Sequence, residues 1–208
     1  MIYEFPTLDQ PIRQGDVFTH LPRIEISFEN LTVLDEEGPL DISWEEAAFT
    51  SENVKAILPV RPVTAVVITQ DCDTLRANEI SLCEIRPFRD VEGKAKHTKD
   101  AKGWVSIITQ HSRMNLKWFY LPPDDQIGFD DKMAVDFSTT LRIRRVDLEG
   151  FRRFRKGRLN SVADEHFRER LAEFFRRYPY DEWYALDAEE LAEYRKRNPE
   201  VAAFPWQK

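Results

Sequence analysis

The fold is decided by residues 61–87, which read RPVTAVVITQDCDTLRANEISLCEIRP. Residues 63–69 are a nearly continuous β-branched run, which is typical of a strand buried on both faces. In the second half Ile80, Leu82 and Ile85 alternate with polar residues, which is typical of a half-buried strand. The stretch therefore predicts two strands that are joined by a polar loop.

The polar loop holds most of the candidate chemistry of the chain. Within seven residues it places an amide, two acids, a thiol and an arginine: Gln70, Asp71, Asp73, Cys72 and Arg76. A rigid strand that ends in such a loop is a common way for a scaffold to present functional side chains. The alternative is that Asp71 and Asp73 only cap a tight turn.

The composition describes a soluble globular chain of 208 residues, 42% apolar and 12% aromatic. This is enough for one good-sized domain, or for one domain with appendages. The N-terminal residues lack the basic head and apolar run of a signal peptide, and no stretch approaches membrane-spanning length. Two cysteines argue against a disulfide framework. We therefore expect a cytoplasmic protein without a membrane partner.

The charges are segregated along the chain, although the net charge is only −7. Residues 24–54 contain no lysine or arginine, and this segment predicts an exposed acidic insertion over 29–55 with a short helix at 43–49, capped by Ser43 or Asp41. Residues 142–158 are strongly basic. The cations of this run are Arg142, Arg144, Arg145, Arg152, Arg153, Arg155, Lys156 and Arg158. They indicate a groove for an RNA backbone, or a solvated basic face, and the acidic insertion could fold over that groove.

The order of the predicted elements indicates a mainly β fold with C-terminal helices. Strands are expected at 16–21, 24–28, 118–121 and 133–146, whereas 104–110 fits either a strand or a short helix. Helices are expected over 161–178, with Ser161 as cap, and over 187–197. Short strands followed by helices favour a small closed or half-closed barrel. The predicted domain spans 1–180, and 181–208 forms a helical appendage.

The chain has Gly15-Asp16-Val17-Phe18 early and, later, Arg61-Pro62, which leads into the apolar strand 65–69. In this order the two motifs resemble those of the PemK/MazF-like toxins of bacterial toxin–antitoxin pairs. The resemblance extends through 81–85, the basic run 144–159 and the helix that starts at Ser161. It covers roughly residues 14–178, in the same order and with insertions. The individual motifs are short, and their order carries the resemblance.

The resemblance implies an SH3-like barrel, usually a homodimer, that cleaves single-stranded RNA without a metal or other cofactor and pairs with an antitoxin-like protein. In that family an arginine and a nearby Thr, Ser, Asp or His activate the ribose 2′-hydroxyl. Arg61 matches the family's arginine. The family's second catalytic group falls near Arg86-Pro87, where this chain has neither a hydroxyl nor an acid.

The residues themselves supply further candidates for metal-free RNA cleavage, which needs a base, an acid and a cation on the phosphate. Asp71 or Asp73 could act as base and His111 as acid or base. Guanidinium groups bind phosphate in two places, which makes arginines the candidate clamps. The predicted catalytic set is Arg61, Asp71, Asp73 and His111, and the predicted substrate-binding set is Gln70, Cys72, Arg76, Arg86, Arg142 and Arg144.

Cys72 suggests two further kinds of chemistry, which are nucleophilic catalysis by its thiolate and metal binding. Flanking carboxylates raise the pKa of a thiol, which disfavours a thiolate nucleophile. A metal held by Asp71, Cys72, Asp73 and a distant histidine lacks the paired-cysteine spacing of zinc sites, so no metal is predicted. Cys83 is expected in the core.

The leading hypothesis is a protein that acts on or binds single-stranded RNA. The alternative is a non-catalytic module that uses the 70–76 loop to bind a partner protein or a small ligand.

Overall fold

The computed structural model describes residues 2–49, 53–91, 95, 97–114, 117–176, 188–197 and 199–200, without side chains at 110–114 and 188. The strands are β1 (Tyr3–Glu4), β2 (Asp16–Ile24), β3 (Leu31–Asp35), β4 (Gly38–Ile42), β5 (Ala56–Ile57), β6 (Val60–Val67), β7 (Glu79–Pro87), β8 (Trp118–Leu121), β9 (Met133–Arg144) and β10 (Arg155–Leu159). The helices are α1 (Trp44–Phe49), α2 (Asp71–Thr74), α3 (Phe88–Val91), α4 (Ala101–Met114), α5 (Arg145–Gly150), the 3-10 turn η2 (Arg152–Phe154), α6 (Ser161–Phe175) and α7 (Ala188–Arg195).

Seven strands form one antiparallel sheet in the order β1-β10-β2-β6-β7-β9-β8. The two strands predicted from residues 61–87 are β6 and β7, and they pair directly at its centre. In the described part of the chain no ladder joins the edge strands β1 and β8, so the sheet is not closed into the predicted barrel. The mainly β character and the helices that follow the last strand are as predicted.

Each face of the large sheet is covered by a different helix. Phe167 of α6 is fully buried against one face, which carries Val66 and Phe137. Leu148 of α5 is fully buried against the other, which carries Leu21 and Val63. A third cluster, which includes Phe88 and Trp104, lies between α3, α4 and β8. Successive residues of β6 and β7 therefore enter opposite cores, one on each side of the sheet. The prediction of a half-buried second strand is wrong, because Leu82 and Cys83 of β7 are buried on opposite faces.

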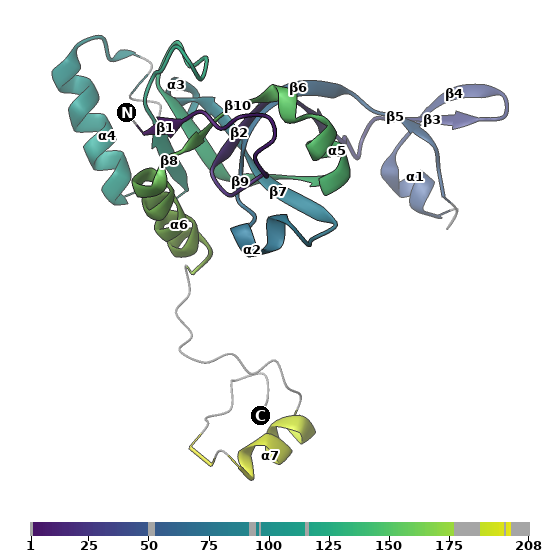
Figure 1. Ribbon diagram of the computed structural model, residues 1–208. Helices are drawn as coiled ribbons and strands as arrows, with labels where there is room; N and C mark the ends of the chain where they lie inside the picture. Colours follow the sequence, from purple (N-terminus) through teal and green to yellow (C-terminus); the bar gives the residue numbers. More distant parts are fainter. Residues whose placement is uncertain are drawn as a thin grey trace. The chain divides into compact units, whose positions relative to one another are not determined.

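The acidic insertion has a small sheet of its own, in the order β4-β3-β5, and α1 covers one side of it. Figure 1 shows this sheet and α1 beyond one end of the large sheet. Of the two predicted caps, Ser43 and Asp41, the structure has Ser43, which forms a capping box with Glu46: the Ser43 amide donates to Glu46 Oε2 at 2.7 Å, and the Glu46 amide donates to Ser43 Oγ at 3.2 Å. The acidic segment is thus a folded insertion between β2 and β6.

The predicted strands 16–21 and 24–28 are one strand, β2, which ends at Ile24, so residues 25–28 are not a strand. Residues 104–110, which fitted either a strand or a short helix, belong to helix α4, because Trp104, Ile107 and Ile108 contact one cluster at helical spacing. The strand predicted over 133–146 ends at Arg144, where α5 begins. The cap of α6 is Asn160 in place of Ser161, since the Ala163 amide donates to Asn160 Oδ1 at 3.0 Å.

The chain divides into two compact units, residues 1–175 and 176–208. In the second unit α7 is described, and its Leu191 is buried. Tyr178 and Pro179, which the sequence placed at the end of the preceding helix, and the predicted cap Asp187 lie outside the described residues. Among the described residues, no helix combines the length and the apolar character that crossing a bilayer requires.

Candidate functional site

The predicted catalytic residues lie at opposite ends of the β6–β7 hairpin. Arg61 is at the start of β6 and Arg86 at the end of β7, whereas α2 and the 70–76 loop connect the other ends of the two strands. Six residues of extended strand separate Arg61 from Val67, which corresponds to about 20 Å. Asp71 and Asp73 therefore do not form one site with Arg61, and the structure instead presents two separate candidate sites.

The first candidate site is an open cleft at the Arg61 end of the sheet. In the ladders Arg23 pairs with Arg61, and Ala65 pairs with Glu84. Paired residues point to the same face of a sheet, as do alternate residues of one strand. Arg23, Arg61 and Glu84 therefore continue the face whose apolar part α5 covers. Here the covered apolar face gives way to charged side chains.

Glu84 is the centre of this first site, which we name the Glu84 cleft. Its side chain is only 4% exposed, and Arg61 Nη2 lies 2.9 Å from its Oε1. Arg23 donates a hydrogen bond to the other carboxylate oxygen. Arg61 also donates from Nε to Glu25 Oε1 at 2.6 Å, and Glu25 directly follows β2. The carboxylate thus lies between two guanidinium groups, each of which is partly exposed.

The rest of the cleft adds a third cation and two hydroxyl groups. The cleft has a volume of about 450 Å³ and is lined by Arg23, Arg61, Pro62, Val63, Thr64, Glu84, Ile85, Arg86, Pro87, Asp90 and Thr139. Arg86 is 42% exposed, and its Nη1 lies 4.0 Å from Asp136 Oδ2. Asp136 is itself held by the hydroxyls of Ser138 and Thr139, at 2.6 and 3.0 Å. Arg86 therefore has the loosest ion pair of the three arginines.

Arg61 and Arg86 were predicted from the sequence as site residues, whereas Arg23 and Glu84 were not. A signal for Glu84 was present, because it continues the alternation of Ile80 and Leu82 and so occupies an apolar position of a strand. A buried acid in such a position requires a partner. The identity of that partner depends on the register between neighbouring strands, and the alternation of residues along one strand does not show that register.

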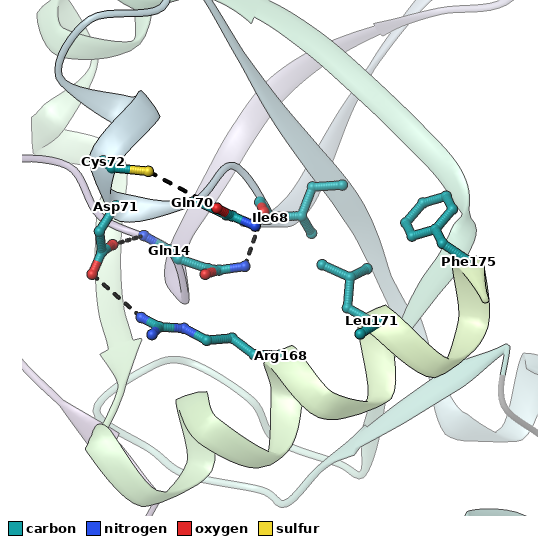
Figure 2. Close-up of a pocket in the computed structure, with 9 residues that line it drawn as sticks. Gln14, Ile68, Gln70, Asp71, Cys72, Arg168, Leu171 and Phe175 are labelled. Carbon is teal, nitrogen blue, oxygen red and sulfur yellow. Dashed lines mark hydrogen bonds and ion pairs between the residues drawn. The ribbon is translucent and has the colours of Figure 1, made fainter. Parts of the chain in front are cut away.

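The second candidate site is formed by the 70–76 loop and helix α6 (Figure 2). We name it the Gln14 pocket. Its volume is about 570 Å³, and its lining residues are Gln14, Ile68, Gln70, Asp71, Cys72, Arg168, Leu171, Ala172 and Phe175. Asp71 is fixed on both sides: its Oδ1 accepts a hydrogen bond from the backbone N–H of Gln14 at 2.8 Å, and its Oδ2 lies 3.3 Å from Arg168 Nη2. Asp71 and Cys72 therefore line a cavity, whereas Asp73 does not.

Arg168 also lines a second hollow of about 620 Å³ beside this pocket, and Asp164 is another lining residue of that hollow. Arg168 Nη2 lies 2.6 Å from Asp164 Oδ2, whereas Asp164 Oδ1 is buried and has no hydrogen-bond partner among the described residues. Burial raises the pKa of this carboxyl above its ordinary value, and the Arg168 charge opposes that shift. Gly15 approaches Oδ1 so closely that a Cβ there would lie 3.1 Å from it, and its φ of +81° also favours glycine.

The remaining predicted binding residues form exposed ion pairs outside both cavities. Arg76 pairs with Asp73 at 2.8 Å, Arg142 with Glu79 at 3.1 Å, and Arg144 with Asp147 at 2.7 Å. His111 lies in helix α4, and its side chain is outside the described part of the structure.

The predicted RNA groove along residues 142–158 is not an open basic surface. Arg155 and Arg158 point into the protein, where both pair with the buried Asp16, at 3.1 and 2.6 Å. Arg145 and Arg152 pair with Glu149. The basic run is neutralised at most of its positions by nearby acids, and part of it belongs to the interior.

Comparisons with known proteins add no assignment: no family model matches the chain, and no curated protein is significantly similar to it. A search of the described side chains found no cluster of three or more His, Cys, Asp or Glu residues able to hold a metal ion.

Proposed function

We propose that this chain binds single-stranded RNA in the Glu84 cleft and cleaves its backbone without a metal, as a divergent relative of the PemK/MazF-like toxins with their SH3-like architecture. The observation that carries the proposal is the Glu84 carboxylate, which is held between Arg23 and Arg61 at the floor of an open polar cleft. A carboxylate flanked by guanidinium groups offers a proton acceptor and phosphate ligands at one point. Arg61 also matches the family's arginine in the sequence.

The roles follow from the exposure of each group. Arg61 and Arg86 are each more than 40% exposed, so both can turn toward a phosphate that enters the cleft. Guanidinium groups bind phosphate oxygens in two places and stabilise the charge that develops in the transition state. Glu84 is nearly covered, so a substrate has to draw Arg61 away from it before Glu84 can accept a proton. Phosphate binding and activation of Glu84 are therefore one event.

The cleavage step balances without an added reactant. Glu84 accepts the proton of the ribose 2′-hydroxyl, and the 2′-oxygen forms a bond to the adjacent phosphorus. The bond from phosphorus to the 5′-oxygen breaks, and that oxygen takes a proton from water. Glu84 then returns its proton to solvent. The products are a 2′,3′-cyclic phosphate and a 5′-hydroxyl end.

The test is a digest of fluorescently labelled single-stranded RNA in EDTA, together with binding measured by anisotropy. Glu84→Gln is expected to bind RNA but to cleave it about 10²–10⁴-fold more slowly, which is the usual contribution of a general base. Arg86→Ala is expected to weaken binding and to lower its dependence on salt, because a phosphate contact is lost.

Two controls separate this site from the rest of the surface. Arg144→Ala removes an exposed arginine outside the cleft and should change neither binding nor cleavage. Asp71→Ala acts at the far end of the hairpin and should retain cleavage. Loss of cleavage in Asp71→Ala with full activity in Glu84→Gln would refute the proposed site. Intact RNA in every wild-type digest would refute the activity.

A second function is favoured by a different observation. The 70–76 loop lines its own pocket, and that pocket contains none of the cleft arginines. This arrangement supports the alternative of a non-catalytic module that binds a small ligand through the loop.

A further inference from the structure

The Gln14 pocket presents two carboxamide groups side by side (Figure 2). Gln14 Nε2 donates to the Ile68 carbonyl at 3.0 Å, which fixes the orientation of this amide. Its Oε1 has no hydrogen-bond partner among the described residues and can accept a bond from a ligand. Gln70 is exposed, and its Oε1 lies 3.9 Å from the Cys72 thiol. The Gln70 Nε2 group can therefore donate to the same ligand.

The opposite side of the pocket is apolar. Ile68, Leu171 and Ala172 line it together with Phe175, whose side chain is 64% exposed. Figure 2 shows Leu171 and Phe175 along the same side of helix α6, across from the two glutamines. An exposed aromatic ring beside aliphatic side chains offers a stacking surface for a flat ring. The pocket thus combines an amide edge with an apolar wall.

The charges of the region disfavour a phosphate in this pocket. Arg168 is the only cation in the lining, and it is already paired with Asp71 and Asp164. The adjoining hollow is lined by five acids and three arginines. The acids are Glu4, Asp71, Asp164, Glu165 and Glu169, and the arginines are Arg13, Arg158 and Arg168. The part of a ligand that lies inside the pocket is therefore expected to carry no charge.

We infer that the Gln14 pocket binds a neutral nucleobase, whose amide-type edge pairs with Gln14 and Gln70 while its ring stacks on Phe175. Glutamine side chains pair with base edges through one donor and one acceptor, and aromatic side chains stack on any base. The base could belong to a free nucleoside or to an unpaired position of an RNA strand. The inference rests on the ligand-binding alternative above and does not require cleavage in the Glu84 cleft.

The test titrates the purified full chain with adenosine, guanosine, cytidine and uridine, each up to about 5 mM, and follows binding by calorimetry. At least one nucleoside is expected to bind, and to bind more tightly than its own 5′-monophosphate. Phe175→Ala and Gln70→Ala are expected to weaken that binding at least about fivefold, the lower end of what base stacking contributes. Both side chains are exposed, so both variants are expected to fold.

The matched control is Phe151→Ala, which removes an exposed aromatic ring on another element and should leave nucleoside binding unchanged. An RNA oligomer of about eight nucleotides that contains the preferred base identifies the source. Tighter binding of the oligomer, lost in Phe175→Ala, assigns the base to a strand, and equal or weaker binding assigns it to a free nucleoside. Arg61→Ala should bind the nucleoside normally, which separates this inference from the cleavage proposal. No binding of any nucleoside, preference for the monophosphate, or unchanged binding in Phe175→Ala would overturn it.

Discussion

Asp16 and Arg155 form a buried ion pair, with 3.1 Å between Oδ2 and Nη1 and at most 1% of either side chain exposed. Arg158 completes the arrangement, because its Nε lies 2.6 Å from Asp16 Oδ1. The pair joins β2 to β10, and Arg155 also donates to backbone carbonyls of the segment between β1 and β2. The Gly-Asp motif, which carries part of the family resemblance, and the end of the basic run, which indicated an RNA groove, therefore hold the fold together.

Asp16→Asn is expected to destabilise the protein by about 3–5 kcal/mol, because removing one partner of a buried ion pair leaves an uncompensated charge. Two arginines would lose their acid at once. Urea denaturation followed by circular dichroism measures the change. Asp73→Asn removes an exposed ion pair and is the control, expected to leave the unfolding midpoint nearly unchanged. Equal midpoints for the two variants would contradict the structural role of Asp16.

Glu25→Gln is expected to raise the affinity for single-stranded RNA. The Arg61 side chain donates to the Glu25 carboxylate and lowers its pKa, so Glu25 occupies one donor of the cleft. The amide holds Arg61 less strongly and leaves it available to phosphate. Anisotropy at low and high salt measures the effect, and the gain should shrink as salt increases. Glu29→Gln, whose carboxylate forms no ion pair with any of the described residues, is the comparison variant. An equal gain in both would mean that only the net charge matters.

The two cysteines are expected to differ sharply in reactivity. Burial, followed by the nearby Asp136 charge, raises the pKa of Cys83 to about 12, whereas Cys72 is exposed beside the Gln14 pocket. The thiolate is the reactive form, so Cys83 should not react in the folded state. Alkylation near pH 8, followed by mass spectrometry of peptides, should modify Cys72 in the native chain and both cysteines in denaturant. Modification of Cys83 in the native chain would argue against its burial in the sheet.

Asp164 is expected to make the protein less stable as the pH rises above its ordinary pKa of 3.8. Its pKa is raised in the folded state, mainly by burial, so the folded chain holds this proton more tightly than the unfolded chain. Stability therefore falls between pH 3.8 and the raised value and is constant above it. The side chain of the Asp164→Asn variant stays neutral at every pH, so the variant should lack this loss of stability. Thermal unfolding at several pH values between about 3.5 and 7 measures the difference between variant and wild type. A constant difference across that range would refute the assignment.

Local patterns were sufficient where a structure depends on neighbours in the sequence. The β-branched run and the alternation that follows it predicted two strands, β6 and β7, because apolar runs and alternations are local patterns. The cap at Ser43 was readable for the same reason, with Asp41 as its alternative. Residues 104–110 were ambiguous, since a short apolar run fits a strand and a buried helix equally well.

The candidate sites depend on long-range contacts instead. Glu84 meets Arg23 and Arg61 only because of the register of three strands, and Asp71 meets Arg168 from 97 positions away. The sequence alone determined the strands, the helices that follow them, and the chemical groups that the chain can offer. The tertiary structure alone decided which of those groups share a cavity, because register and helix packing are fixed by burial of the whole core.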